Sequence, residues 1–301
     1  MSSIKTVIAT INGQEYTLTY NSTSGKYEAT ITAPSTTSYH VNSEHYYPVT
    51  IKATDNAGNV ATINDTDSTF GAKLKLRVKE TVKPTINVTS IGANAILTTN
   101  SPAITFTVTD TGAGVNKSTV TLKIDDTAVT LPAPTEITNG YSWTYNASGL
   151  SDGSHTIKID ATDYDDNKAT QFTRTFTVDT VPPTLNVTAP SNGIATNNKT
   201  LTVTGTTNDA TSSPVSVTIA VNGTDAGAVT VGSNGSFSKA VTLTEGTNTI
   251  TIVATDKAGK TTTVTRTVEL DTSIPVFTSV TVTPNPVNTG ASYTISVEVN
   301  S

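Results

Sequence analysis

The segment "ATDNAGNVAT" at residues 53–62 decides the fold, because the chain repeats it twice. Close variants follow as "ATDYDDNKAT" at 161–170 and "ATDKAGKTTT" at 254–263. Apolar residues alternate with polar ones before each copy, as in a strand with one buried face, and each copy contains turn-forming residues. A second alternating segment follows and ends at a proline. The pattern therefore predicts that each copy is the turn of a β-hairpin that closes a domain.

The spacing of the copies predicts β-sandwiches. They lie about 90–110 residues apart, which suits a seven-stranded sandwich. In the third repeat we expect seven strands, at residues 185–189, 201–205, 215–221, 228–231, 237–243, 250–254 and 264–270. We therefore predict an all-β chain of tandem sandwiches in an elongated array, joined by short proline-containing linkers. The expected divisions are residues 1–81, 82–181, 182–273 and 274–301.

The composition agrees with this class and excludes others. Of the 301 residues only 14% are charged and 6% are aromatic, and there is no cysteine, so the sandwiches are held without disulfides. The net charge of −6 argues against nucleic acid as a partner. No apolar run approaches the roughly 20 residues that cross a membrane.

The segments "ATDNAGN", "FTVDTVPPTLNVTAP" and "GSFSKAVTLTEGTNTITIVATDKAGK" resemble the tandem bacterial immunoglobulin-like domains, over almost the whole chain. The resemblance implies immunoglobulin-like sandwiches. It says little about function, because such modules occur in adhesins, secreted enzymes and phage tails.

Two further features favour the phage members of this group. The first residues, "MSSIKTVIATINGQ", lack the apolar segment of a secretory signal. The segment "VTVTPNPVNTGASYTISVEV" at 280–299 resembles terminal segments of clostridial prophage tail-region proteins. We therefore expect a non-enzymatic structural or surface-contact protein of a phage tail or phage-like particle. The alternative is a fragment of a secreted bacterial adhesin stalk, or of the accessory immunoglobulin-like region of a cell-surface glycosidase.

The two ends of the chain are unequal in a complementary way. Residues 1–81 align with the third repeat only from its third strand onward, so the first domain lacks about 27 residues, or two strands, of the template. Residues 274–301 contain two strand-like segments and no more of a domain. A sandwich without these strands has an unpaired edge that invites strand addition. We interpret residues 274–301 as strands that complete the first domain of another copy or of another protein. The other interpretation is a longer array cut in phase with its repeat.

Strand alternation names the residues of this contact. The donor side chains expected to face the partner's core are Val280, Val282, Tyr293, Ile295, Val297 and Val299. The acceptor face is expected to include Tyr27, Ala29 and Ile31 on the neighbouring strand, with Val49, Ile51, Leu74 and Leu76 across the core. Such a contact is head to tail, so it closes into a ring or continues as a filament.

An aromatic loop is a second candidate site. Residues 37–49 gather Tyr39, His40, His45, Tyr46 and Tyr47, and long loops commonly carry binding residues. They could contact a host cell-surface polysaccharide. The interpretation we favour is that Tyr46 or Tyr47 closes one end of the sandwich.

An acidic loop is a third candidate. "DYDDN" at 163–167 brings Asp163, Asp165 and Asp166 together, and "DTGAG" at 110–114 lies in another loop of that domain. Such oxygen-rich loops can bind Ca²⁺, but the EF-hand spacing is absent, and Asp and Asn are ordinary turn residues. We therefore expect no cofactor and little effect of calcium, with a calcium site as the alternative.

Catalytic motifs are absent from the sequence. It has three histidines, no cysteine, and none of the common nucleophile or phosphate-binding patterns, so we expect no enzyme. The expected partners are other copies or another virion protein, in a virion or at the cell surface. One feature has no explanation from sequence: strict alternation places Arg174 and Arg266 on the core face of their strands.

Overall fold

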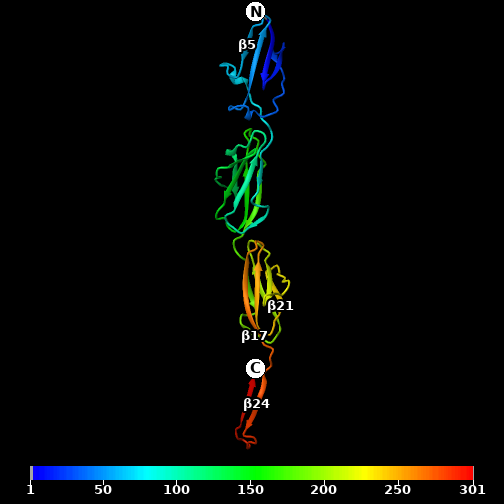
Figure 1. The fold of residues 1–301 in the computed structure, drawn as a ribbon, viewed down its shortest axis with the longest axis vertical. Helices are drawn as coiled ribbons and strands as arrows, with labels where there is room; N and C mark the ends of the chain where they lie inside the picture. The colour runs from blue at the N-terminus through cyan, green and yellow to red at the C-terminus, as the bar shows by residue number, and fades with distance from the viewer. Residues whose placement is uncertain (1–2, 301) are drawn as a thin grey trace. The chain divides into compact units, whose positions relative to one another are not determined.

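The computed structural model describes residues 3–300, and nearly all of its regular structure is β-strand (Figure 1). It divides into two compact units, residues 1–95 with 100–177 and residues 178–301 with 96–99. Each unit is considered by itself.

The third domain is a two-layer sandwich. One sheet has the order β16-β18-β21 and the other the order β17-β23-β22-β19-β20. Its strands are β16 (Thr184–Ala189), β17 (Ile194–Thr196), β18 (Thr200–Asn208), β19 (Ser216–Val221), β20 (Thr224–Asp225), β21 (Ser236–Thr242), β22 (Gly246–Thr255) and β23 (Thr261–Leu270). The expected strand at 228–231 is replaced by the short β20 and a single bridge between Val231 and Phe237. The all-β sandwich prediction is thus confirmed, with β17 as an additional strand parallel to β23.

The core of this domain comes from the inward residues of both sheets. On β22, Ile250, Ile252 and Ala254 are 0% exposed, and Val203 of β18 faces them from the other sheet, also at 0%. The alternation of apolar and polar residues in the sequence therefore corresponds to the inner and outer faces of the sandwich.

The second domain has the same arrangement. Its sheets have the orders β12-β13-β9-β7 and β11-β10-β14-β15-β8. The strands are β7 (Thr85–Val88), β8 (Ala95–Leu97), β9 (Ala103–Thr109), β10 (Thr121–Ile124), β11 (Thr127–Ala128), β12 (Thr135–Ile137), β13 (Gly140–Asn146), β14 (Gly153–Asp160) and β15 (Phe172–Val178). A 3-10 turn, η3 (Lys117–Thr119), precedes β10.

The two inward arginines bind backbone carbonyls in or just after the first strand of their domains. Arg174 donates from Nη1 to the carbonyl oxygens of Val88, at 3.3 Å, and Ile91. Arg266 donates from Nη2 to the carbonyl oxygen of Val187 at 3.4 Å. Val88 ends β7, and Val187 stands at a register shift of β16, so the guanidinium groups supply donors to carbonyls at irregular points of the first strand.

The first domain is a single sheet with the order β3-β2-β1-β4-β5, and β6 also pairs with β4. Its strands are β1 (Ile4–Ile11), β2 (Gln14–Asn21), β3 (Lys26–Glu28), β4 (Tyr47–Asp55), β5 (Val60–Ile63) and β6 (Lys75–Leu76), with 3-10 turns η1 (Ser38–His40) and η2 (Gly71–Leu74). Asn12 and Gly13 turn β1 into β2 with positive φ angles of 49° and 75°. Asn222 and Gly223 do the same between β19 and β20, at 52° and 81°, so β1 corresponds to β19.

Two expectations for the first domain are wrong. Tyr27, Ala29 and Ile31 were expected to form a strand of the second sheet, but β3 ends at Glu28 and pairs with β2 in the same sheet. Among the described residues no strand pairs with residues 29–31. The only strand that β3 pairs with is β2, which precedes it in the chain. Leu74 and Leu76 belong to the alternating segment that follows the first copy of the turn, which predicts a second strand of the closing hairpin. Instead Leu74 ends η2, and only the two-residue β6 follows.

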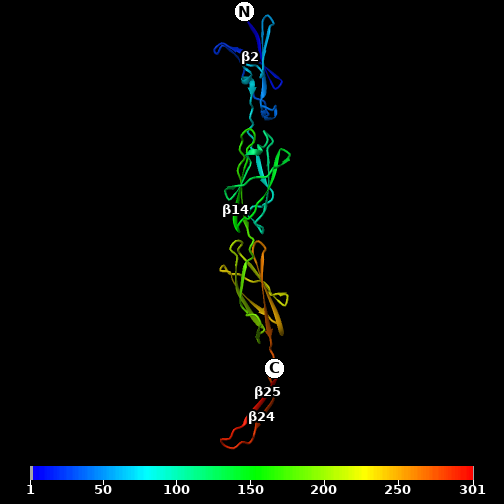
Figure 2. The same ribbon diagram turned by 90° about the vertical axis from the view of Figure 1, so that its left-hand side faces the viewer.

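Residues 276–300 form a hairpin of β24 (Val276–Thr283) and β25 (Thr294–Asn300). Among the described residues these strands pair only with each other, and they are drawn in orange and red in Figure 2. A two-stranded hairpin by itself is only marginally stable in water.

Candidate functional site

One face of the first domain's sheet is apolar. The register pairs Val7 with Ala53, Ala9 with Ile51 and Ile11 with Val49, and directly opposed residues share a face. The three residues of β1 are buried, but those of β4 are only partly buried. Of the remaining expected acceptor residues, Tyr27, Ile31, Leu74 and Leu76 are partly buried and Ala29 is exposed. The face therefore keeps apolar surface in contact with solvent.

The terminal hairpin has one apolar and one polar face. Val280 pairs with Val297 and Val282 with Ile295, so these expected donor residues share a face, while polar pairs such as Thr281 and Ser296 lie on the other. Val280 is 61% exposed and Ile295 is 59% exposed. Tyr293, Val297 and Val299 are exposed as well.

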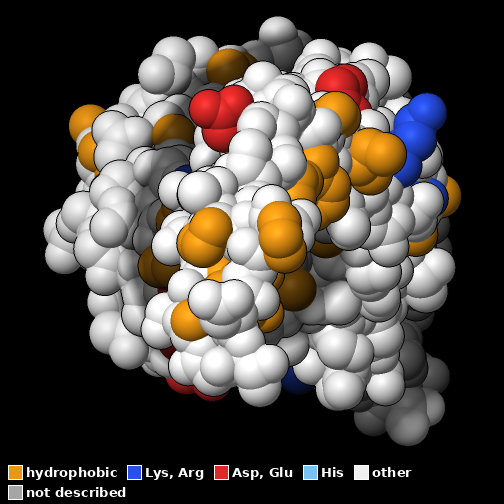
Figure 3. Space-filling view, turned by 90° about the horizontal axis from the view of Figure 1, so that it is seen from below, with side chains coloured by type: hydrophobic (Ala, Val, Ile, Leu, Met, Phe, Trp, Pro, Cys, Tyr) orange, Lys and Arg blue, Asp and Glu red, His pale blue; other side chains and the backbone are white. Residues whose placement is uncertain are grey.

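Sequence alternation missed one residue of this face. Phe277 pairs with Val299 and is 69% exposed. The register shift between Phe277 and Ser279 interrupts the alternation, which hid it in the sequence. Figure 3, which views the molecule from below relative to Figure 1, shows several apolar side chains, in orange, at the surface.

The hairpin matches the first two strands of a complete sandwich. Both strand pairs have a register shift, after Val187 in β16 and after Phe277 in β24. Matching the two shifts aligns Val297 of β25 with Val203 of β18. Val203 is 0% exposed. The hairpin therefore presents to solvent the positions that the third domain buries.

The aromatic loop is packed rather than free. Tyr46 and Tyr47 are buried within the first domain, as we favoured. The Tyr39 ring stacks on the His45 ring at 4.0 Å and on the Tyr164 ring of the second domain at 4.2 Å. Burial, together with the neighbouring Tyr164 hydroxyl, raises the pKa of Tyr39 to about 12. His40 Nε2 lies 3.1 Å from the carbonyl oxygen of Gly112. All five rings of the loop are thus buried or in contact within the first compact unit. Binding of a surface polysaccharide by this loop stays a prediction.

The acidic side chains of residues 163–167 do not all point to one place, and two of them bind residues of the first domain. Asp165 accepts hydrogen bonds at Oδ2 from Thr37 Oγ1, at 2.6 Å, and from the backbone N–H of Glu80. Asp166 forms an ion pair with Lys79 at 2.7 Å. Both residues thus hold the end of the first domain to the second. They do not join Asp163 as ligands of one ion.

Asp163 lies instead in a cluster with Glu80 and Asp110. One carboxylate oxygen from each lies within 4.8 Å of the others. Asp110 and Asp163 are buried, at 6% and 0% exposure. Burial and the adjacent Asp163 carboxylate raise the pKa of Glu80. The sequence signal that could have found this cluster is the recurrence of an acid at the end of each closing strand, at Glu80, Asp179 and Asp271.

A second cluster has the same composition in the third domain. Asp179, Asp209 and Asp256 each offer one oxygen within 4.8 Å of the others, and all three are buried. None of these three residues was a candidate ligand from the sequence.

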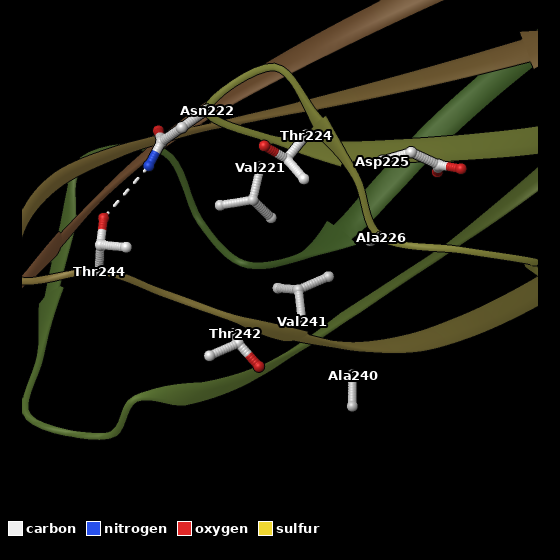
Figure 4. Close-up of a pocket in the computed structure, with 9 residues that line it drawn as sticks. All are labelled: Val221, Asn222, Thr224, Asp225, Ala226, Ala240, Val241, Thr242 and Thr244. Carbon is white, nitrogen blue, oxygen red and sulfur yellow. Dashed lines mark hydrogen bonds between the residues drawn. The ribbon is translucent and has the colours of Figure 1, made fainter.

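A cavity of about 410 Å³ opens in the third domain beside β20 and β21 (Figure 4). Asn222 Nδ2 donates to Thr244 Oγ1 at 3.3 Å along its wall. Its other side chains are small, and Asp225 is the one titratable group among them. The cavity thus brings together no pair of groups suited to acid–base or nucleophilic catalysis.

Two families match parts of the chain. Residues 84–159 match the bacterial Ig domain, and residues 183–272 match domain B of glucodextranase. No curated protein matches the chain significantly. Among the described residues no helix is long and apolar enough to cross a membrane.

Solved structures with similar folds include tandem modules of several kinds. Fibronectin(III)-like modules of Clostridium thermocellum CbhA are 20% identical, with 62% of this chain and 94% of that chain covered and a TM-score of 0.37. A bacterial ice-binding adhesin is 24% identical, with coverages of 90% and 88% and a TM-score of 0.33. Immunoglobulin domains 1–5 of Sidekick-1 are 10% identical, with coverages of 99% and 60% and a TM-score of 0.40.

At these TM-scores the likenesses carry no information about function. The family matches cover residues 84–159 of the second domain and 183–272 of the third, and the repeated hairpin extends the same pattern to the first domain. The protein therefore consists of tandem immunoglobulin-like domains of the bacterial type.

Proposed function

We propose that the chain is a non-enzymatic structural segment of an extracellular surface assembly, and that copies join head to tail by strand complementation. The terminal hairpin of one copy lies on the open apolar face of the first domain of the next. The single observation that carries this proposal is the exposed apolar face of the hairpin, opposite a polar face. An apolar face on an isolated pair of strands favours burial against a second sheet.

The third domain supplies the geometry of the proposed contact. There β18 pairs with β16 on one side and with β21 on the other. By analogy β25, paired with β24, would pair on its free edge with residues 29–33 of the acceptor, which follow β3. Residues 29–33 form no strand in the structure, so no β-ladder among the described residues uses their backbone groups. Each Val or Ile side chain buried in this way would contribute about 1.5–3 kcal/mol, less the cost of ordering.

The matched families support one biological setting more than the other. Glucodextranase domain B and the bacterial Ig domain favour an adhesin stalk, or an accessory region of a surface carbohydrate-active enzyme. A phage tail is the second setting, supported by the resemblance of residues 280–299 to prophage tail-region segments. Strand complementation would serve a spacer or a filament in either setting.

The test compares two pairs of substitutions on β25. Ile295→Asp with Val297→Asp places two carboxylates on the apolar face, where burial without partners costs several kcal/mol. Thr294→Asp with Ser296→Asp adds the same charge to the polar face and is the matched control. Sedimentation velocity over a range of concentrations should show assembly of the parent and of the control, and a monomer for the apolar-face variant. A parent that stays monomeric at every concentration, or an apolar-face variant that assembles like the parent, would contradict the proposal.

A further inference from the structure

We propose that the chain has two equivalent calcium sites, one in each complete sandwich, at the end where the chain enters the domain. The first consists of Glu80, Asp110 and Asp163, and the second of Asp179, Asp209 and Asp256. This inference is independent of strand complementation, and it reverses the turn-only interpretation that the sequence favoured for the acidic loop.

The two clusters occupy the same three positions of the fold. Asp110 follows β9 directly, and Asp209 follows β18, the corresponding strand of the third domain. Asp163 and Asp256 stand at the same position of the repeated "ATD" turn. The third acid of each cluster lies just beyond the closing strand of the preceding domain. A turn preference would explain each acid separately, but it would not bring three of them together twice.

The carboxylates are buried and incompletely paired. In the first cluster Oδ1 of Asp110 accepts hydrogen bonds from the backbone N–H groups of Gly112 and Gly114, at 2.9 and 2.8 Å, and its Oδ2 is buried without a partner. In the second cluster Oδ2 of Asp179 and Oδ2 of Asp256 are both buried without a partner. Asp179 is 0% exposed and Asp256 6%. Asp110, Asp179 and Asp256 thus each have one oxygen held by backbone N–H groups and one buried oxygen without a partner. Asp163 differs, because its Oδ2 accepts a hydrogen bond from Asn167 Nδ2 at 2.7 Å.

The charge of each cluster calls for a cation. Three carboxylates in a small, water-poor space repel one another, and no lysine or arginine is ion-paired with any of the six acids in the described part of the chain. A divalent cation bound to the free oxygens would offset this repulsion. The cost of an unpaired buried oxygen would also be removed.

The ligand chemistry selects calcium. All six side chains offer oxygen, and no cysteine or histidine belongs to either cluster, which disfavours zinc and copper. The acids lie on loops and a linker whose backbone carbonyls and bound waters can complete the six to eight oxygen ligands that Ca²⁺ takes. Mg²⁺ demands a stricter octahedron and is the weaker candidate.

A bound ion at the first cluster would tie the end of the first domain to two loops of the second. Glu80 already contacts the second domain, since Asn167 Nδ2 donates to its Oε1 at 3.1 Å. Gly112 allows this approach, because a Cβ at that position would lie 2.5 Å from Glu80 Cδ. Calcium would therefore stiffen a junction that the Tyr39 and Asp165 contacts position.

The first domain shows what a site requires. Its copy of the turn places Asp55 like Asp163, with Oδ1 accepting from the backbone N–H groups of Ala57 and Asn59. No further cluster of three forms around Asp55 among residues 3–300. The strand that carries Asp110 or Asp209 in the complete domains has no counterpart in this sheet, so we expect two sites and not three.

The test is a calcium titration of the full chain with single-site variants. Asp110→Asn and Asp209→Asn each remove one charge and keep an oxygen at the hydrogen-bonded position. Isothermal titration should give two calcium ions for the parent, one for each single variant and none for the double variant. Asp166→Asn is the matched control, an exposed acid of the same loop, and should still bind two.

Terbium, a luminescent substitute for calcium, separates the two sites. Tyr164 follows Asp163 and lines a cavity with Asp110, whereas residues 182–273 contain only one aromatic residue, Phe237. Tyrosine-sensitised emission should therefore disappear in Asp110→Asn and persist in Asp209→Asn.

Urea unfolding excludes a purely structural role for the acids. Without metal, Asp110→Asn should be more stable than the parent, because a repulsive charge is gone, and with calcium it should be less stable. The proposal would be overturned if the parent bound no calcium at millimolar concentration. It would also be overturned if Asp110→Asn and Asp209→Asn both bound as many calcium ions as the parent.

Discussion

The first and third domains have a corresponding central strand, β4 and β22, but bury its inward side chains to different extents. In the third domain Ile250, Ile252 and Ala254 of β22 are 0% exposed beneath the sheet of β16, β18 and β21. Their counterparts in β4, Val49, Ile51 and Ala53, are only partly buried. Both strands have the same alternation of apolar and polar residues. The difference therefore comes from the second sheet and not from the sequence pattern of β4 and β22.

The comparison predicts unequal costs for the same truncation. Ile252→Ala removes a fully buried side chain from the third domain and should lower its free energy of unfolding by about 2–5 kcal/mol. Ile51→Ala should cost clearly less in the monomer, because part of that side chain is already in solvent. Urea unfolding followed by hydrogen exchange, which resolves the domains, measures both.

Assembly of copies should bring the cost of Ile51→Ala closer to that of Ile252→Ala. If a partner's hairpin covers β4, the cost of Ile51→Ala rises at protein concentrations where copies associate. An Ile51→Ala cost equal to that of Ile252→Ala in a proven monomer would show that the first domain is complete by itself.

The junction within the first compact unit should contribute a smaller amount. Tyr39→Ala removes the stacking on Tyr164 and His45, and stacked aromatic pairs contribute about 0.5–1.5 kcal/mol beyond their buried area. We expect lower thermal stability of the first domain and no change in the third. Tyr20→Ala, an exposed tyrosine whose ring lies 5.3 Å from that of Tyr27, is the control within the same domain. An equal loss of thermal stability in Tyr39→Ala and Tyr20→Ala would contradict a stabilising role of the Tyr39 stacking.

The smallest expected effect distinguishes the two complete domains by pH. His155 Nδ1 lies 2.7 Å from Asp125 Oδ2 and Nε2 lies 2.8 Å from the carbonyl oxygen of Ser151. Burial acts to lower the pKa of His155, but the hydrogen bonds to Ser151 and Asp125 outweigh it and the pKa is raised. The third domain has uncharged Asn248 at the equivalent position, with Nδ2 donating to the carbonyl oxygen of Thr244.

The sign of the pH effect follows from this shift. A histidine whose pKa is higher when folded contributes stability that is fully present below its unfolded pKa of about 6.5. That contribution disappears as the pH rises through the folded value. The urea midpoint of the second domain should therefore be lower at pH 8.5 than at pH 5.5, and the midpoint of the third domain should change less. His155→Asn should abolish the difference, and a difference that survives this variant would contradict the assignment.

Alternation and turn chemistry were sufficient to predict the sandwiches, because apolar periodicity and the Asn-Gly turns are local signals. Residues 29–31 show the limit of this reasoning. Their apolar pattern predicts a strand, yet a strand needs an edge to pair with, and within the described residues none is offered to them. Sequence spacing could not show which edge a segment finds.

The candidate sites divide in the same way. The donor residues of β25 follow from alternation alone, but Phe277 does not, since a register shift moves it onto the apolar face. The acidic loop was found as a cluster in sequence, yet its members separate in space. Asp163 joins Asp110 from a loop about 50 residues away, whereas its neighbour Asp165 binds Thr37. Such partners depend on which loops the sandwich brings to one end.

The most direct test of strand complementation is amide hydrogen exchange of residues 29–33, measured in a chain truncated after residue 275 and then with a peptide of residues 274–301 added. These amides belong to no strand in the structure, so they should exchange rapidly in the truncated chain. If the peptide supplies the missing strands, they become protected, and a peptide carrying Ile295→Asp and Val297→Asp has no effect. Protection before any peptide is added, or none after it is saturating, would contradict the account.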